Sequence, residues 1–129
     1  MESSVLQRIV VVLVRPEGPL NVGSVARLCG NFGCALRLVQ PIADRDSSEA
    51  MKMAHPQQTF LAQAPVFSSV RDALTDVSLA IATSSKLLDA VETPVLSAAR
   101  AKLMLPAPAE RVALVFGNET SGLSNEELQ

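Results

Sequence analysis

The chain has 129 residues, of which 48% are hydrophobic and 19% are charged, and it carries a formal net charge of −2 at pH 7. These values are typical of one ordinary globular domain and exclude a disordered chain, a collagen and a coiled coil. The longest uninterrupted apolar run, Ile9 to Val14, is far shorter than the roughly 20 residues that span a bilayer, and no small-residue cleavage site follows it. We therefore expect a cytoplasmic protein with no membrane partner.

The chain opens with a strand and a helix. Residues Arg8–Val14 form a continuous run rich in β-branched side chains, which predicts a strand covered on both faces in a parallel sheet. Asn21 is predicted to cap a helix from Val22 to about Phe32, where apolar residues recur at helical spacing. Gly33 is expected to end this helix.

The rest of the chain repeats this alternation of strand and helix signals. The predicted strands cover Leu36–Val39, Val66–Phe67, Leu79–Thr83 and Arg111–Phe116. The first predicted helices are one opened by Asp46 or Ser47 that runs through Met53 and a helical piece over Gln57–Gln63. Two more helices are predicted, one from a capping box of Ser69 and Asp72 to near Asp76 and one from Thr93 to about Leu105. This order predicts an α/β fold with a mostly parallel sheet flanked by helices.

Cysteine and histidine give little sign of a metal site. Cys29 and Cys34 are expected on different faces of one helix and its cap, so both are interpreted as buried thiols rather than a disulfide or a metal pair. His55 is the only histidine and precedes a proline, so we interpret it as structural. No metal is predicted.

Ligands of open parallel sheets bind at the carboxyl ends of the strands, so the loops after Val14, Thr83 and Phe116 are the candidate site. In the first, Asn21 and Arg27 could both face a ligand, although spacing alone favours a helix cap and a solvated arginine. The loop after Phe116 holds Glu119 between two glycines, and this is either a ligand site or an ordinary polar turn. Neither loop has a Walker or a G-x-G-x-x-G pattern.

Two motifs carry a family resemblance. The segment from Pro19 to Arg27, followed by Asn31-Phe32-Gly33, resembles the first motif of the SpoU (TrmH) branch of the SPOUT RNA methyltransferases. The segment from Leu114 to Leu128 resembles the second motif, and it is most similar to the TrmJ type, as is Ala50-Met51-Lys52-Met53-Ala54 between them. Together the motifs cover nearly the whole chain.

The resemblance implies an α/β-knot fold, a homodimer and transfer of a methyl group from S-adenosylmethionine to a ribose 2′-hydroxyl of RNA. The implied substrate is tRNA at an anticodon-loop pyrimidine, or ribosomal RNA as in other relatives. A non-catalytic RNA-binding module of the same fold and an unrelated nucleotide-binding protein are the alternative hypotheses.

The resemblance also implies roles for individual residues. Arg27, Asn21 and Glu119 would be the catalytic residues, and the cofactor would lie against Thr83, Ser84, Gly117, Asn118 and Gly122. Family accounts make the arginine a general base. Because a guanidinium stays charged in proteins, we favour a role in binding phosphate and in stabilising the developing oxyanion.

The sequence departs from the family pattern at two places. Ser85-Lys86 stands where an arginine usually follows the strand-end threonine, and the third motif, which completes the knot and the adenine pocket, is absent. Ser124 and Glu127 form a further capping box that predicts a helix just before the last residue. We therefore expect residues 1–129 to be a methyltransferase domain cut off before its knot-forming part, in a longer gene product.

Overall fold

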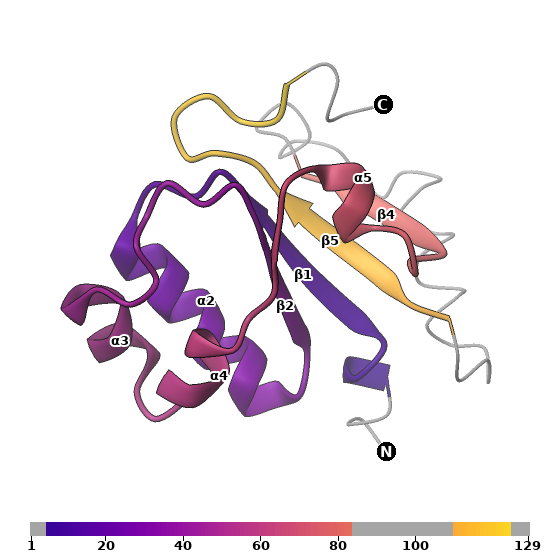
Figure 1. The fold of residues 1–129 in the computed structure, drawn as a ribbon. Coiled ribbons are helices and arrows are strands. Elements are labelled where there is room, and N and C mark those ends of the chain that lie inside the picture. The colour runs from indigo at the N-terminus through magenta and orange to yellow at the C-terminus, as the bar shows by residue number, and fades with distance from the viewer. Residues whose placement is uncertain (1–4, 84–109, 125–129) are drawn as a thin grey trace.

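The computed structural model describes residues 5–83 and 110–124. In these residues five strands form one sheet in the order β3-β2-β1-β5-β4, and every adjacent pair is parallel (Figure 1). The strands are β1 (Ile9–Val14), β2 (Ala35–Val39), β3 (Val66–Phe67), β4 (Leu79–Ala82) and β5 (Val112–Phe116). The predicted α/β fold with a parallel sheet is confirmed.

Helices pack on both faces of the sheet (Figure 1). They are α2 (Pro19–Phe32), α3 (Ser48–Ala54), α4 (Gln58–Ala62) and α5 (Val70–Ala73). One core lies between the sheet and α2, α3 and α4, and the other lies beneath α5. No helix within the described residues has the length and apolar character needed to span a membrane.

Strand β1 is at the centre of the sheet and contributes to both cores. Val10, Val12 and Val14 are fully buried on the α5 side, while Leu13 packs against α2 and α3 on the other side. This double burial is the reason that β1 is apolar throughout rather than alternating, as the sequence predicted.

Helix boundaries differ from the prediction at two places. Helix α2 begins at Pro19 with Gly18 as its N-cap, so the prediction that Asn21 caps it is wrong. Proline suits this first position because it has no N–H to satisfy. Helix α5 ends at Ala73 rather than near Asp76, because Arg37 donates a hydrogen bond to the Ala73 carbonyl that a longer helix would use.

Other local predictions agree with the structure. Gly33 ends α2 in the left-handed conformation, with φ of 82°, and the Ser47 hydroxyl caps α3 by accepting from the Ala50 N–H. Cys29 and Cys34 are both free thiols; Cys29 is buried as predicted, whereas Cys34 is only partly buried. Burial raises the pKa of Cys29 to about 12. The predicted helix from Thr93 to Leu105 lies outside the described residues.

Candidate functional site

A pocket of about 240 Å³ lies at the carboxyl ends of β1 and β5, beside the start of α2. It is lined by Leu13, Pro16, Asn21, Val22, Val25, Phe116, Gly117 and Glu119. From β1 the chain crosses by way of α2 to β2, while β5 lies on the opposite side of β1. Ligands of open α/β sheets bind at such a switch in strand order.

Glu119 connects the loop after β5 to the beginning of α2. Its Oε1 accepts a hydrogen bond from the Glu17 N–H at 2.9 Å, and its Oε2 accepts one from the Gly18 N–H at 2.8 Å. The Asn21 amide donates to the same Oε2 at 3.4 Å. Burial raises the pKa of Glu119, but the hydrogen bonds from the backbone and from Asn21 together outweigh that effect and leave the pKa below its ordinary value. Glu119 is therefore held as a carboxylate at the pocket rim.

Asn118 shapes the loop rather than facing a ligand. The side chain is buried, its Nδ2 donates to the Arg15 carbonyl at 2.7 Å, and its Oδ1 accepts from the Thr120 and Ser121 N–H groups at 2.9 Å each. The structure thus gives the Asn118 side chain a role in holding the loop, which the sequence did not predict.

Gly117 and Gly122 of this loop are glycines for different physical reasons. A Cβ on Gly117 would lie 2.5 Å from the Gly122 carbonyl carbon, so the chain can close on itself only without a side chain. Gly122 has φ of 69°, which disfavours other residues, and open space where its Cβ would be. The space on the Cβ side of Gly122 is therefore open, while its N–H and its carbonyl form hydrogen bonds with Asn118 and Arg15.

Thr83 lies at the next strand end. Its N–H and its hydroxyl both donate to the Val115 carbonyl, at 2.9 and 3.1 Å. Thr83 thereby extends the pairing of β4 with β5 toward the 117–122 loop. Ser84, Ser85 and Lys86 lie outside the described residues.

Arg27 is apart from the pocket. It lies six positions after Asn21 on α2, which corresponds to about 9 Å along the helix axis. Its side chain is exposed and forms no hydrogen bond or ion pair with the described residues. The structure therefore brings together Asn21, Gly117 and Glu119 and leaves Arg27 available to a group that approaches α2 from solvent.

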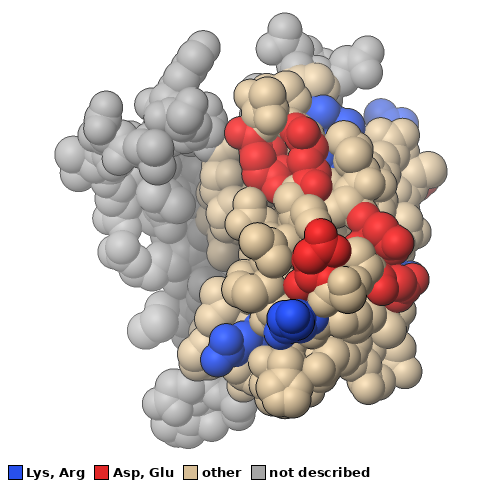
Figure 2. All heavy atoms as spheres, turned by 90° about the vertical axis from the view of Figure 1, so that its left-hand side faces the viewer, with Lys and Arg blue, Asp and Glu red and all other residues tan. Residues whose placement is uncertain are grey.

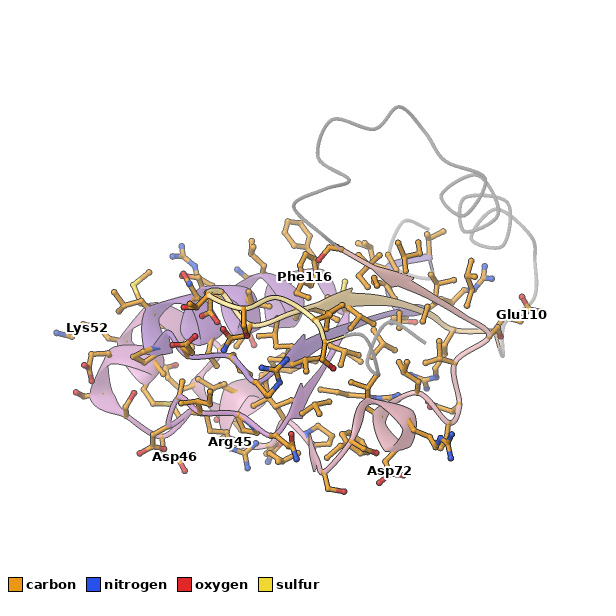
Figure 3. All side chains as sticks on the ribbon, turned by 90° about the horizontal axis from the view of Figure 1, so that it is seen from above. Arg45, Asp46, Lys52, Asp72, Glu110 and Phe116 are labelled. Carbon is orange, nitrogen blue, oxygen red and sulfur yellow. The ribbon has the colours of Figure 1, made fainter. Side chains whose placement is uncertain are left out.

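No role was predicted from the sequence for Pro16, Phe116 or Arg15. Pro16 and Phe116 line the pocket, and the Phe116 ring projects from one side of the sheet while Asp72 of α5 lies on the other (Figure 3). The register pairs Phe116 with Leu13, so both point toward α2. The sequence signal that could have identified Phe116 is its position as the last residue of a buried strand. Arg15 contacts the 117–122 loop from the end of β1.

The pocket combines an apolar floor with a polar rim. Leu13, Val22, Val25 and Phe116 supply the floor, and Asn21 and Glu119 supply the rim. Figure 2 looks onto the side of the molecule that bears α3 and shows several acidic groups with fewer basic ones. This side is a poor surface for phosphate, which is bound by clustered basic residues. No group of residues suited to hold a metal occurs in the described part of the chain.

The residues present fit part of a nucleoside cofactor site. Gly117 lines the pocket at the carboxyl end of β5, and Gly122 has open space on its Cβ side; Thr83 lies at the adjacent strand end. Sites for drug-sized ligands enclose roughly 300–1,000 Å³. A pocket of about 240 Å³ is below that range, so the described residues supply only some of the walls that such a ligand needs.

Comparison with known proteins supports an RNA methyltransferase relationship. The family model of the SpoU rRNA Methylase family matches residues 8–129. The chain is 37% identical over 127 residues to the tRNA (cytidine/uridine-2′-O-)-methyltransferase TrmJ of Escherichia coli K12, which covers 96% of this chain and 51% of that protein. The chain thus spans about half the length of the curated relatives that it matches.

Solved structures show the same fold. A probable methyltransferase from Bordetella pertussis Tohama I is 30% identical with a TM-score of 0.80, and the match covers 97% of this chain and 78% of that one. TrmJ from Z. mobilis ZM4 is 32% identical with a TM-score of 0.72, and the match covers 92% of this chain and 53% of that one.

Proposed function

Because the chain belongs to the SpoU rRNA Methylase family, we propose that it forms part of an RNA ribose 2′-O-methyltransferase that acts on tRNA. The observation that carries the proposal is the pocket at the β1 and β5 strand ends, where Asn21 and Glu119 meet. The choice of tRNA follows the TrmJ relatives, whose name gives cytidine and uridine riboses of tRNA as substrate. A cytoplasmic location belongs to the same proposal.

The proposed cofactor is S-adenosylmethionine, which supplies a methyl group on a sulfonium centre when it is bound. Gly117 and Gly122 would hold it through backbone groups, together with Thr83, the backbone of Asn118 and the sequence position Ser84. An approach to backbone suits these residues because the Asn118 side chain is already fully engaged within the loop.

Arg27 is proposed to act on the RNA. A ribose 2′-hydroxyl is a poor nucleophile until positive charge stabilises the oxyanion that develops as its proton leaves. The Arg27 side chain is exposed and makes no hydrogen bond with the described residues, and a guanidinium offers several donors that suit a phosphate and that oxygen. Asn21 lies nearer the pocket and is proposed to orient the ribose, while Glu119 holds Asn21 and the start of α2 in place.

A homodimer is the proposed assembly. Leu20, Leu28 and Phe32 are each more than half exposed on α2, and large exposed apolar groups of this kind mark interaction surfaces. The net charge of −2 gives the chain no overall attraction for RNA, so the phosphate contacts are proposed to come from the apposed partner and from sequence beyond this domain.

The test is transfer of labelled methyl from S-adenosylmethionine to pooled tRNA by the full-length protein and its Arg27→Ala variant. We expect the variant to lose at least a hundredfold in transfer and to bind the cofactor within twofold of the wild type, because Arg27 does not line the pocket. Arg71→Ala is the matched control, since Arg71 is an exposed arginine on α5, and we expect it to keep full transfer.

Other outcomes change the proposal in defined ways. Label in ribosomal RNA but not in tRNA would keep the reaction and change the substrate. RNA binding without cofactor binding would favour the non-catalytic module. Loss of cofactor binding in Arg27→Ala would show that the role assigned to Arg27 is wrong.

A further inference from the structure

We infer that Arg15 is a positioning residue that fixes the 117–122 loop, and through it the cofactor side of the pocket. The assignment of the pocket to a cofactor rests on the proposed function, whereas the contacts between Arg15 and the loop do not depend on it. Arg15 follows the last residue of β1 and does not line the pocket.

Both the backbone and the side chain of Arg15 contact the loop. The Arg15 carbonyl accepts from the Asn118 Nδ2 at 2.7 Å. The guanidinium donates from Nη1 to the Ser121 hydroxyl at 3.3 Å and from Nη2 to the Gly122 carbonyl at 3.1 Å. Arg15 therefore contacts both ends of the turn that carries Glu119.

The backbone of Arg15 is itself held in an unusual conformation. Its φ is 49°, in the left-handed region that residues with a Cβ disfavour, and its N–H donates to the Val39 carbonyl at 2.7 Å. This conformation turns the chain away from the line of β1 at the point where its side chain reaches the loop. Such conformations persist where surrounding contacts fix them, and they are frequent at functional sites.

The loop needs this support because its own contacts are local. The Gly122 N–H donates to the Asn118 carbonyl at 2.8 Å, and the Asn118 side chain accepts from two further N–H groups of the turn. These bonds close the turn but do not fix it relative to β1. The contacts of Arg15 and Glu119 do so, and Glu119 depends on the turn for its own position.

An arginine suits this role better than a lysine. The guanidinium presents separate donors in a planar fork, which reach the Ser121 hydroxyl and the Gly122 carbonyl at the same time. An ammonium carries its three donors on one nitrogen and lacks the planar fork, so it fits this pair of acceptors less well. Arg15→Lys should therefore retain part of the support, and Arg15→Met should retain none of the side-chain contacts.

The experiment combines hydrogen exchange of the full-length protein with cofactor kinetics. The reporters are the amides of Thr120, Ser121 and Gly122, whose hydrogen bonds close the turn. In Arg15→Met we expect their exchange to rise about tenfold and KM for S-adenosylmethionine to rise about tenfold with kcat within twofold, because the two hydrogen bonds from the guanidinium to the turn are lost at a partly exposed site. Arg15→Lys should show a smaller rise in both.

Arg37→Met is the matched control. Arg37 is a partly buried arginine on β2 that donates to Asp76 and to the Ala73 carbonyl on the α5 side of the sheet. Its loss should lower the melting temperature without changing exchange of the three amides or KM for the cofactor. This control separates a positioning role from general destabilisation.

The outcomes distinguish the inference from the proposed function. Unchanged exchange of the three amides in Arg15→Met overturns the inference, whatever the activity. If Arg15→Met does not fold, exchange of the same three amides in Arg15→Lys tests the inference instead. A wild-type protein that binds no cofactor removes the proposed function, and raised exchange in the variants would still establish Arg15 as the support of the loop.

Discussion

Glu119 is the residue on which the pocket rim depends. Its carboxylate accepts two backbone N–H groups and the Asn21 amide from a segment about a hundred positions earlier in the chain. Hydrogen bonds to an ionised acceptor are about twice as strong as neutral ones. These contacts lower the pKa of Glu119 because they favour its charged form.

The Glu119 contacts make a testable contribution to stability that depends on pH. The pKa of Glu119 is lower in the folded state than in the unfolded state, so ionised Glu119 stabilises the fold at pH values above the ordinary pKa of about 4.5. This stabilisation is lost as the pH falls through the folded-state pKa. Glu119→Gln should lower the free energy of unfolding by about 1 kcal/mol at pH 7, allowing for solvent screening. The difference from the wild type should vanish in acid, as measured by urea unfolding between pH 3 and 7.

Glu17→Gln is the control for this measurement. It removes the same charge from a neighbouring exposed side chain that makes no hydrogen bond with the described residues. We expect no change in stability at either end of the pH range. A difference for Glu119→Gln that persists unchanged at pH 3 would contradict the electrostatic origin.

The contact of Asn21 with Glu119 also explains why part of the site could not be predicted from local patterns. Asn21 precedes a helical apolar pattern and is a favourable capping residue, so the local rule made it the N-cap. Its actual partner lies in the loop after β5, which becomes a neighbour only because β1 and β5 pair. Arg15 was missed for the same reason, whereas the local pattern of glycines around Glu119 was enough to predict a loop of interest, and Gly117 and Glu119 do line the pocket.

At the scale of elements, α2 and α3 approach closely at a glycine. A Cβ on Gly23 would lie 2.2 Å from the Ala50 carbonyl oxygen and 2.8 Å from the Met53 Cβ. Ala50 and Ala54, both fully buried, are correspondingly small on the facing helix. The two helices thus pack by backbone contact next to the pocket, which places the start of α2.

Gly23→Ala should therefore separate α2 from α3. We expect the free energy of unfolding to fall by about 1–3 kcal/mol, as for overpacking in a core, despite the higher helix propensity of alanine. Gly30→Ala in the same helix is the control, because its added Cβ would meet only the flexible Gln57 side chain. That variant should be neutral or slightly more stable, and equal urea midpoints for the two variants would contradict the packing argument.

Elements were easier to predict than their exact ends. The strands were found within one residue because burial on both faces gives long apolar runs, as in β1 and β5. Helix α5 was overestimated because the Arg37 contact with the Ala73 carbonyl and Asp76 comes from another strand. Tertiary contacts of this kind override a capping pattern.

At the scale of the whole molecule, α2 has two different faces. Val22, Ala26 and Cys29 are buried against the sheet and α3, while Leu28 and Phe32 are each 56% exposed and belong to the outer side of α2 that solvent reaches. Arg27 lies next to Leu28 on this outer side. The proposed homodimer would therefore bury apolar groups beside the residue that is proposed to bind RNA.

Leu28→Glu is the sharpest test of that assembly. A carboxylate placed in an apolar interface without a partner costs at least about 2–3 kcal/mol, which weakens dimerisation by on the order of a hundredfold. Light scattering after size-exclusion chromatography should give a dimer for the wild type and a monomer for the variant at the same micromolar concentration. Ile42→Glu, at a 64% exposed position after β2, should leave the dimer intact. A monomeric wild type, or a dimer that survives Leu28→Glu, would mean that the outer side of α2 is not the interface.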